Sequence, residues 1–326
     1  MNNQKNKRLT DHFDGKRFFN AGVSFRNFSH VLKWKLTSTP IPWPSSRENI
    51  YEAKPDRRMQ NDEEIGLTFV NHSTMLIQWG KINMLTDPIW GKRAGPFNFL
   101  GPRRIHPPGI AFENLPPIDI ILLSHNHYDH LDIATLKRLS KVHRPYIVTG
   151  LGNLKWLASR GIEKVIEFDW WQRSELLNTL EIVFIPAQHF SARSVFDINK
   201  TLWGGFALKK GESWIYYSGD TGYCNVFKQV RDKFGPMRLA LLPIGAYKPR
   251  WFMKTVHMSP EEAVQAHMDL HADRSAAMHY GTFHLSDEGI DEPCLALQLE
   301  MERRGIDSDK FWILSPGEFR RLPYGS

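Results

Sequence analysis

The stretch 124–130 reads Ser-His-Asn-His-Tyr-Asp-His and places four potential metal ligands within six residues. His125 and His127 can point to the same side, whereas Asp129 and His130 can face a second point. Imidazole nitrogens and carboxylate oxygens suit zinc or a similar divalent ion. Because four such groups exceed what one catalytic zinc usually takes from one loop, we expect two adjacent ions. The alternative, a histidine-rich surface loop, rarely shows this density of ligands.

The flanking sequence indicates where this cluster lies in the fold. The apolar run 118–123 before it predicts a buried strand. The periodic pattern from Ile133 predicts a helix with Asp132 as its N-cap. The cluster therefore lies on a turn at the carboxyl end of a strand, where α/β folds place their ligands. Strand and helix patterns alternate in the following residues, which is typical of βαβ units.

Three further candidate ligands come directly after predicted strands: His189, Asp220 and His279. Small residues around Asp220, in the run Ser218-Gly219-Asp220-Thr221-Gly222, leave its carboxylate clear. Because each carboxylate oxygen can bind one ion, Asp220 could bridge two metals. Asp87 also ends a predicted strand. It is either a partner of a ligating histidine or a turn former before Pro88.

These seven side chains divide into two ligand sets. The first set is His125, His127 and His189; the second is Asp129, His130 and His279; Asp220 bridges the two. A water molecule between two such ions would be a hydroxide at neutral pH and a ready nucleophile. Asp129 is for this reason a candidate catalytic residue as well as a ligand.

Length and composition restrict the class of protein. The 326 residues allow one large domain or two small ones, with an ordinary globular balance of 41% hydrophobic and 24% charged residues. Cys224 and Cys294 form no CxxC pair, so we expect no structural disulfide and a reducing, cytoplasmic location. Neither a secretory signal nor a membrane-spanning run is visible.

The positive charge is concentrated in the first residues. Residues 1–60 contain 12 Lys and Arg against 5 Asp and Glu, and alternate basic residues with aromatic ones. We expect 1–60 to be a basic aromatic arm and 61–326 to be the catalytic domain. The arm could contact an anionic surface of lipid or nucleic acid, could be a solubilising tail, or could pack its rings on the main domain.

The ligand pattern resembles a known family. The segment 125–130 is similar to the HxHxDH signature of the metallo-β-lactamase superfamily, and Asp87, His189, Asp220 and His279 fall where that superfamily has its other motifs. The resemblance implies an αββα sandwich, in which two mixed β-sheets face each other with helices outside and the metals at one edge.

A closer resemblance runs from about residue 34 to the end of the chain. The tracts 115–119, 124–132, 168–171, 219–224, 243–247, 249–254 and 279–283 resemble N-acyl-phosphatidylethanolamine-hydrolysing phospholipase D. This resemblance implies two zinc ions per chain, a membrane phospholipid substrate, release of N-acylethanolamine and phosphatidic acid by a metal-bridging hydroxide, and a homodimer. One departure is Asn71-His72-Ser73-Thr74, where relatives tend to have Gly-His-Ala-Thr.

Four residues outside the ligand sets are candidates for substrate contact. We expect His257 to orient the phosphate or protonate the leaving group, although it could equally be a loop histidine without a role. Trp251, Phe252 and Met253, together with the apolar residues of 97–100, could form an apolar entrance for acyl chains and a peripheral contact with a membrane. Ordinary core packing is the alternative for these side chains.

Other functions remain open on the sequence. A soluble metal-dependent hydrolase of another ester, lactone or phosphodiester on the same fold is the main alternative. A nuclease ranks lower because the body of the chain has no clear basic patch, so we expect no nucleic-acid partner. A module that only binds metal or lipid is a further class, which the intact set of ligands disfavours.

Overall fold

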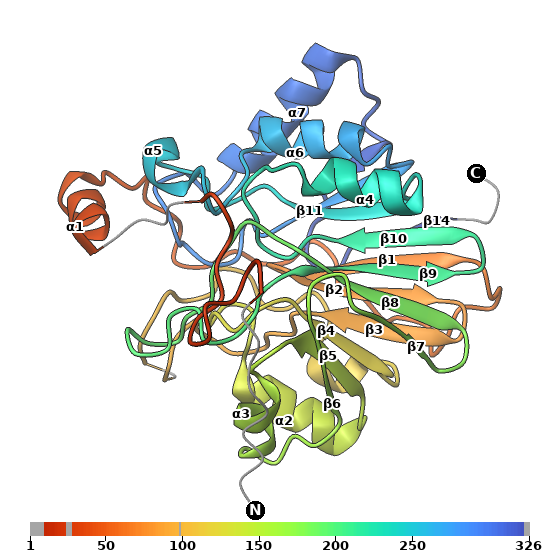
Figure 1. Cartoon of the computed structure of the whole chain (residues 1–326). Helices are drawn as coiled ribbons and strands as arrows, with labels where there is room; N and C mark the ends of the chain where they lie inside the picture. The colour runs from red at the N-terminus through yellow and green to blue at the C-terminus, as the bar shows by residue number, and fades with distance from the viewer. Residues whose placement is uncertain (1–9, 24–27, 98, 323–326) are drawn as a thin grey trace, which may run out of the picture.

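Two seven-stranded β-sheets face each other and carry helices on their outer faces (Figure 1). The structure is a computed structural model and describes residues 10–23, 28–97 and 99–322. The predicted αββα sandwich of two mixed sheets is confirmed.

The first sheet is built by the first half of the chain together with the last strand. Its strands in spatial order are β14 (Phe319–Leu322), β1 (Ile65–Asn71), β2 (Thr74–Trp79), β3 (Ile82–Thr86), β4 (Ile120–Leu123), β5 (Tyr146–Gly150) and β6 (Val165–Phe168). The strands from β3 to β6 are parallel, whereas β1, β2 and β3 form an antiparallel meander. β1 therefore runs in the same direction as β3 and β4.

The second sheet is built by the second half of the chain. Its strands in spatial order are β13 (Phe311–Trp312), β12 (Arg274–Met278), β11 (Leu239–Pro243), β10 (Ser213–Tyr217), β9 (Gly205–Lys210), β8 (Leu180–Ile185) and β7 (Arg173–Leu176). The strands β10 to β13 are parallel, and β9 is antiparallel to both of its neighbours. The strands β8, β10 and β12 consequently point the same way.

Helices cover the outer faces of both sheets (Figure 1). Their bounds are α1 (Phe28–Thr37), α2 (Ile133–Val142), α3 (Leu154–Ala158), α4 (Val226–Phe234), α5 (Arg250–Met253), α6 (Pro260–Asp269) and α7 (Glu292–Arg304), with a 3-10 turn at Phe112–Asn114. α2 and α3 lie on the first sheet, and α4, α6 and α7 lie on the second, whereas α1 and α5 project at one end of the sandwich (Figure 1). As predicted, Asp132 caps α2 by accepting a hydrogen bond from Ala134 N. Ser259 and Glu262 form a capping box at the start of α6.

The main hydrophobic core fills the space between the sheets. Phe184, Phe206 and Tyr217 are fully buried there, with rings stacked or edge-on to one another. Each such ring contributes roughly 2–3 kcal/mol by leaving water. A second, smaller core lies between the first sheet and α2, where Leu136 and Leu139 are buried. Both faces of the first sheet are therefore covered, which explains why β4 is apolar at every position.

The amino-terminal segment lies against the sandwich over the described part of its length. Phe13 and Phe18 are buried in the main core, and His12 contacts Asp169 at 2.7 Å. Packing of these rings on the domain was one of the three alternatives for the predicted arm. Residues 1–9 and 24–27, which include Phe25, lie outside the described residues.

Several elements were not predicted from the sequence. They are α1, α5 and the edge strands β7 and β14. β7 and β14 have mostly exposed residues, so they lack the apolar alternation that marks a half-buried strand. α6 ends at Asp269, so His271, with a φ of 46°, does not share this helix with His267 although the two are four residues apart.

The carboxyl ends of the parallel strands bring the candidate ligands to one edge of the sandwich. β4 leads into the segment 124–130, and β8, β10 and β12 lead to His189, Asp220 and His279. The strand ends lie close together: a Cβ atom at Gly245, beyond β11, would lie 1.9 Å from the carbonyl oxygen of His279. None of the described helices has the length and apolar character required to cross a bilayer.

Candidate metal centre

Three histidine rings of the first ligand set converge on one point. The distance from His125 Nε2 to His127 Nδ1 is 2.8 Å, and that from His189 Nε2 to His127 Nδ1 is 3.3 Å. In each close pair of nitrogens, only one can carry a hydrogen and donate it to the other. With three nitrogens converging on one point, some of their lone pairs therefore face one another. A bound cation removes this conflict, and the three nitrogens lie close enough to share one ion.

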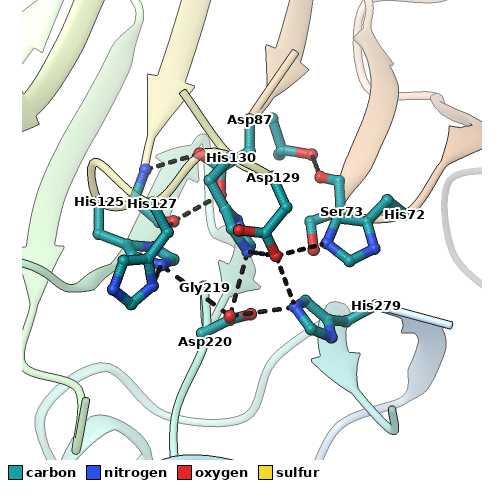
Figure 2. A network of polar contacts seen from close by, with 12 residues as sticks. His72, Ser73, Asp87, His125, His127, Asp129, His130, Gly219, Asp220 and His279 are labelled. Carbon is teal, nitrogen blue, oxygen red and sulfur yellow. Dashed lines mark hydrogen bonds and ion pairs between the residues drawn. The ribbon is translucent and has the colours of Figure 1, made fainter. Parts of the chain in front are cut away.

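The second ligand set lies beside the first and contains a carboxylate. Asp129 Oδ2 is 3.4 Å from both His130 Nε2 and His279 Nε2. The same two nitrogens are 3.0 and 3.1 Å from Asp220 Oδ2. Figure 2 shows the side chains of this set turned toward a common centre. Mixed nitrogen and oxygen donors at these distances could hold a second divalent ion.

Asp220 lies between the two sets. Besides its contacts with the second set, its Oδ2 atom is 3.9 Å from His125 Nε2 and 3.8 Å from His189 Nε2. The carboxylate is buried, with 2% of the side chain exposed. Its Oδ1 atom has no hydrogen-bond partner among the described residues. A buried carboxylate with one unpaired oxygen and four surrounding imidazoles fits a position that bridges two cations.

The ring nitrogens that face away from the centre have partners that fix the rings. His125 Nδ1 is 2.8 Å from Ser124 Oγ, and His189 Nδ1 is 2.9 Å from the carbonyl oxygen of Val256. Such outer contacts set the tautomer and the orientation of a ligating histidine.

Asp87 supplies the outer contact of His130, as one of its two sequence interpretations suggested. Asp87 Oδ2 is 2.5 Å from His130 Nδ1 and accepts a hydrogen bond from Tyr217 at 2.5 Å. The backbone N–H of Ser124 donates to Asp87 Oδ1 at 2.7 Å. The carboxylate is fully buried, and Asp87 has a φ of 30°, a conformation that tertiary contacts must impose. Asp87 thus connects the ligand segment 124–130, which follows β4, to Tyr217 of β10 in the second sheet.

The two sets differ in their protonation. Burial lowers the pKa of His127 to about 3 and that of His189 to about 4, so both rings are neutral at pH 7 and have free lone pairs. Burial also opposes the charge on His279, but the carboxylates of Asp220 and Asp129 prevail and raise its pKa to about 9. The same balance raises the pKa of His130 well above its ordinary value. These two protons must leave before the nitrogens can bind a metal.

His257 lies beside Asp220 and is largely buried. Its Nδ1 atom is 4.0 Å from Asp220 Oδ2 and has no hydrogen-bond partner among the described residues. Arg250 holds this loop in place, because its Nη1 donates to the carbonyl oxygen of His257 at 2.9 Å and its Nη2 donates to Glu262 at 2.7 Å. The ring is therefore positioned near the ligands on a loop that is tied to the start of α6.

The apolar substrate candidates lie at different depths. Trp251 is 38% exposed, and the Phe252 ring stacks on Trp34 of α1 at 4.9 Å between centroids. Met253 is buried, and its carbonyl oxygen accepts the backbone N–H of His257 at 2.9 Å. The apolar residues of 97–100 are exposed, and the rings of Phe97 and Phe99 stack on each other.

Three residues near the centre were missed from the sequence. His72 contacts Asp129 at 3.0 Å. Arg193 donates through Nη1 to the carbonyl oxygens of Asn126 and Leu131, and so clamps the ligand loop from outside. Asn20 donates to the carbonyl oxygen of Ala187 at 2.8 Å and accepts from His189 N at 3.2 Å. The motif around His72 was visible in the sequence as a family tract, but no local signal marks Asn20 or Arg193.

Comparisons of the sequence place the chain among hydrolases of this architecture. Residues 82–280 match the model of the beta-lactamase superfamily domain. The chain is 39% identical over 293 residues to N-acyl-phosphatidylethanolamine-hydrolyzing phospholipase D 1 of Caenorhabditis elegans, covering 83% of this chain and 82% of that protein. It is 36% identical to the mitochondrial N-acyl-phosphatidylethanolamine-hydrolyzing phospholipase D of Saccharomyces cerevisiae, over 73% of this chain and 52% of the yeast protein.

Solved structures share the fold at lower sequence identity. A metallo hydrolase of the archaeon Ignicoccus hospitalis superposes with a TM-score of 0.62 at 20% identity, covering 80% of this chain and 99% of the archaeal one. An isothiocyanate hydrolase from Delia radicum gut bacteria superposes with a TM-score of 0.64 at 22% identity, covering 78% and 98%. These two proteins establish a shared architecture.

Removal of the metal should make the stability of the protein depend on pH in a defined direction. Because the folded pKa of His279 is raised from 6.5 to about 9, its charged pair with Asp220 stabilises the fold fully below pH 6.5, and this contribution is lost as the pH rises through about 9. The melting temperature in excess chelator should therefore fall between pH 6.5 and 9. The variant His279→Gln should show a shallower fall. A wild-type melting temperature that rises over this interval would contradict the assignment.

Proposed function

Since the chain belongs to the metallo-β-lactamase superfamily and is a metal-dependent hydrolase, we propose that it is a zinc phosphodiesterase that cleaves N-acyl-phosphatidylethanolamine-type phospholipids to N-acylethanolamine and phosphatidic acid. The relatives named for this reaction, at 36% and 39% identity, support the choice of substrate. Imidazole and carboxylate donors in two adjacent sets support two zinc ions per chain.

The observation that carries the proposal is the position of Asp220 between two ligand sets. A phosphodiester is an anion with two free oxygens, and two neighbouring cations would neutralise it while activating a water molecule for attack on phosphorus. We assign His125, His127 and His189 to one ion, Asp129, His130 and His279 to the other, and Asp220 to both. Asp129 also lies close enough to the centre to orient the attacking water.

His257 is proposed as the group that meets the substrate phosphate or the leaving alkoxide. Its ring lies at the edge of both sets, and its unpaired Nδ1 atom is available for a substrate oxygen. Burial holds the pKa of His257 well below its ordinary value, so the free ring is neutral at pH 7. A neutral imidazole can donate through one nitrogen and accept through the other, which suits a group that orients a phosphate or moves a proton.

Exposed apolar side chains on α1 and on the loops at 99 and 195–196 support a lipid substrate. Four of the five most exposed large apolar side chains in the described part of the chain are Leu36 of α1, Phe99, Val195 and Phe196, at 71% to 80% exposure. α1 and α5 project at the end of the sandwich to which β10 points (Figure 1). We propose that these side chains, together with Trp251, touch the membrane while acyl chains pass along Phe252 toward the centre.

The test of the proposed reaction is lipid cleavage by the purified full chain. Incubation with N-acyl-phosphatidylethanolamine in mixed micelles should release phosphatidic acid, and metal analysis of the same sample should give about two zinc ions per chain. A fully loaded protein that leaves this lipid intact but cleaves water-soluble esters, lactones or phosphodiesters would instead assign it to the soluble hydrolase alternative.

Replacement of His257 should slow the reaction without releasing the metal. We expect His257→Ala to lower kcat by about a hundredfold, because a positioned proton-transfer group contributes on the order of that factor. Its zinc content should equal that of the wild type. Normal turnover by His257→Ala would return this residue to the status of a loop histidine without a role.

Charged substitutions at the exposed apolar side chains should weaken binding to vesicles. The double variant Phe196→Glu/Trp251→Glu should lower partitioning onto phosphatidylcholine vesicles that contain phosphatidic acid by about tenfold, since each side chain loses its apolar contact. Cosedimentation measures this effect without turnover. The control is Leu299→Glu, which alters a 66% exposed residue on α7. Equal partitioning of the double variant and the wild type would remove the proposed membrane contact.

A further inference from the structure

The hairpin turn between β1 and β2 reaches the metal centre although it contains none of the predicted ligands. β1 points toward the same edge as β4, so the residues that follow it arrive beside the second ligand set. The β1–β2 register shifts between Phe69 and Asn71, which marks a bulge of the kind that re-aims side chains near active sites. His72 then has a φ of 47°, a left-handed conformation that residues other than glycine rarely adopt.

His72 contacts the second ligand set through its side chain and its backbone. Its Nε2 atom is 3.0 Å from Asp129 Oδ2, and its ring centroid is 4.1 Å from that of His279. Its carbonyl oxygen accepts the backbone N–H of His279 at 2.8 Å, and its own N–H donates to Thr282 Oγ1 at 2.9 Å. One buried residue of the β1–β2 turn thus contacts Asp129, which follows β4 of the first sheet, and His279, which follows β12 of the second (Figure 2).

The rest of the turn holds the outer partner of the same set. Thr74 Oγ1 donates to the carbonyl oxygen of Asp87 at 2.7 Å, and Thr86 Oγ1 donates to the carbonyl oxygen of Ser73 at 2.6 Å. The turn is therefore bonded to the strand end that carries Asp87. These hydrogen bonds, together with those of the His72 backbone to Thr282 and His279, hold the left-handed backbone of the turn. They thereby fix the orientation of the His72 ring.

Asp129 depends on this ring for its orientation. Its other side-chain contacts among the described residues are with His130 and His279, which are themselves ligand candidates. When those nitrogens bind a metal, the N–H of His72 is the remaining donor to the carboxylate. The Nδ1 atom of His72 has no hydrogen-bond partner in the described part of the chain, so the ring has its single polar contact at Asp129.

We propose that His72 is a positioning residue, which fixes the Asp129 carboxylate by a hydrogen bond and thereby sets the affinity of the second ligand set for its metal ion. This inference rests on the proposed two-ion centre. It gives a function to the tract Asn71-His72-Ser73-Thr74, which the ligand motifs leave unexplained. The loss of an outer partner of this kind lowers metal affinity by roughly ten- to a hundredfold.

Two variants that differ by one methylene group test the proposal. His72→Asn tolerates the left-handed backbone, but its amide is too short to reach Asp129, whereas the amide of His72→Gln extends to about the position of Nε2. The control is His267→Ala. It removes a buried histidine of α6 whose Nδ1 atom is hydrogen-bonded to Ser275 Oγ on β12, away from the ligand sets. Each full-length protein is stripped with chelator and titrated with Zn²⁺ against a fluorescent chelator, and bound zinc is counted by mass spectrometry.

We expect His72→Asn to keep its first ion and to bind the second ten- to a hundredfold more weakly. His72→Gln should bind both ions within a few fold of the wild type, and His267→Ala should bind both with wild-type affinity. Equal affinities for both ions in His72→Asn and the wild type would overturn this inference alone. Equal weakening of both sites in His72→Asn would also overturn it, since that result indicates a general structural role. A wild-type protein that binds one ion would contradict the proposed two-ion centre itself.

Discussion

The buried carboxylate of Asp220 is the contact around which the centre is arranged. A single oxygen lies within 4.0 Å of nitrogens from five histidine rings, drawn from both sheets. A negative charge at 2% exposure is costly unless positive charge compensates for it. In the absence of metal the protons on His130 and His279 supply that compensation, and metal ions would do so more completely. The same electrostatic requirement therefore accounts for both the geometry of the ligands and their unequal protonation.

The fold meets this requirement by the direction of its strands. β1, β3 and β4 in one sheet and β8, β10 and β12 in the other all end at the same edge, so ligands separated by up to about 150 residues in the sequence become neighbours. Asp220 follows β10 and His279 follows β12, and β11 between them lies so close at Gly245 that a Cβ there would be 1.9 Å from the carbonyl oxygen of His279. The two cores on either side of the first sheet hold β4 rigid, and the ligand loop that follows it is clamped by Arg193 and Asp87.

Much of this arrangement was predictable, because its signals are local. The run before His125 and the capping residue Asp132 mark their elements directly, and ligands placed after strands imply a common edge. The sandwich itself came from the family resemblance, since alternating strands and helices do not determine how two sheets face each other. The edge strands β7 and β14 were missed because they are stabilised by pairing with β8 and β1 and not by an apolar pattern. The contributions of Asn20 and Arg193 depend on tertiary contacts that no local pattern encodes.

The bond between Asn20 and the strand end before His189 also has a consequence for the order of folding. The two partners are separated by 167 residues in the sequence. During synthesis, Asn20 leaves the ribosome long before Ala187 exists, so the segment 10–23 cannot dock until β8 has formed. Until then Phe13 and Phe18 lack the strands that complete the core in which they are buried. Phe13 and Phe18 are thus made before β8 but buried only after it, and docking of this segment is a late step in the assembly of the molecule.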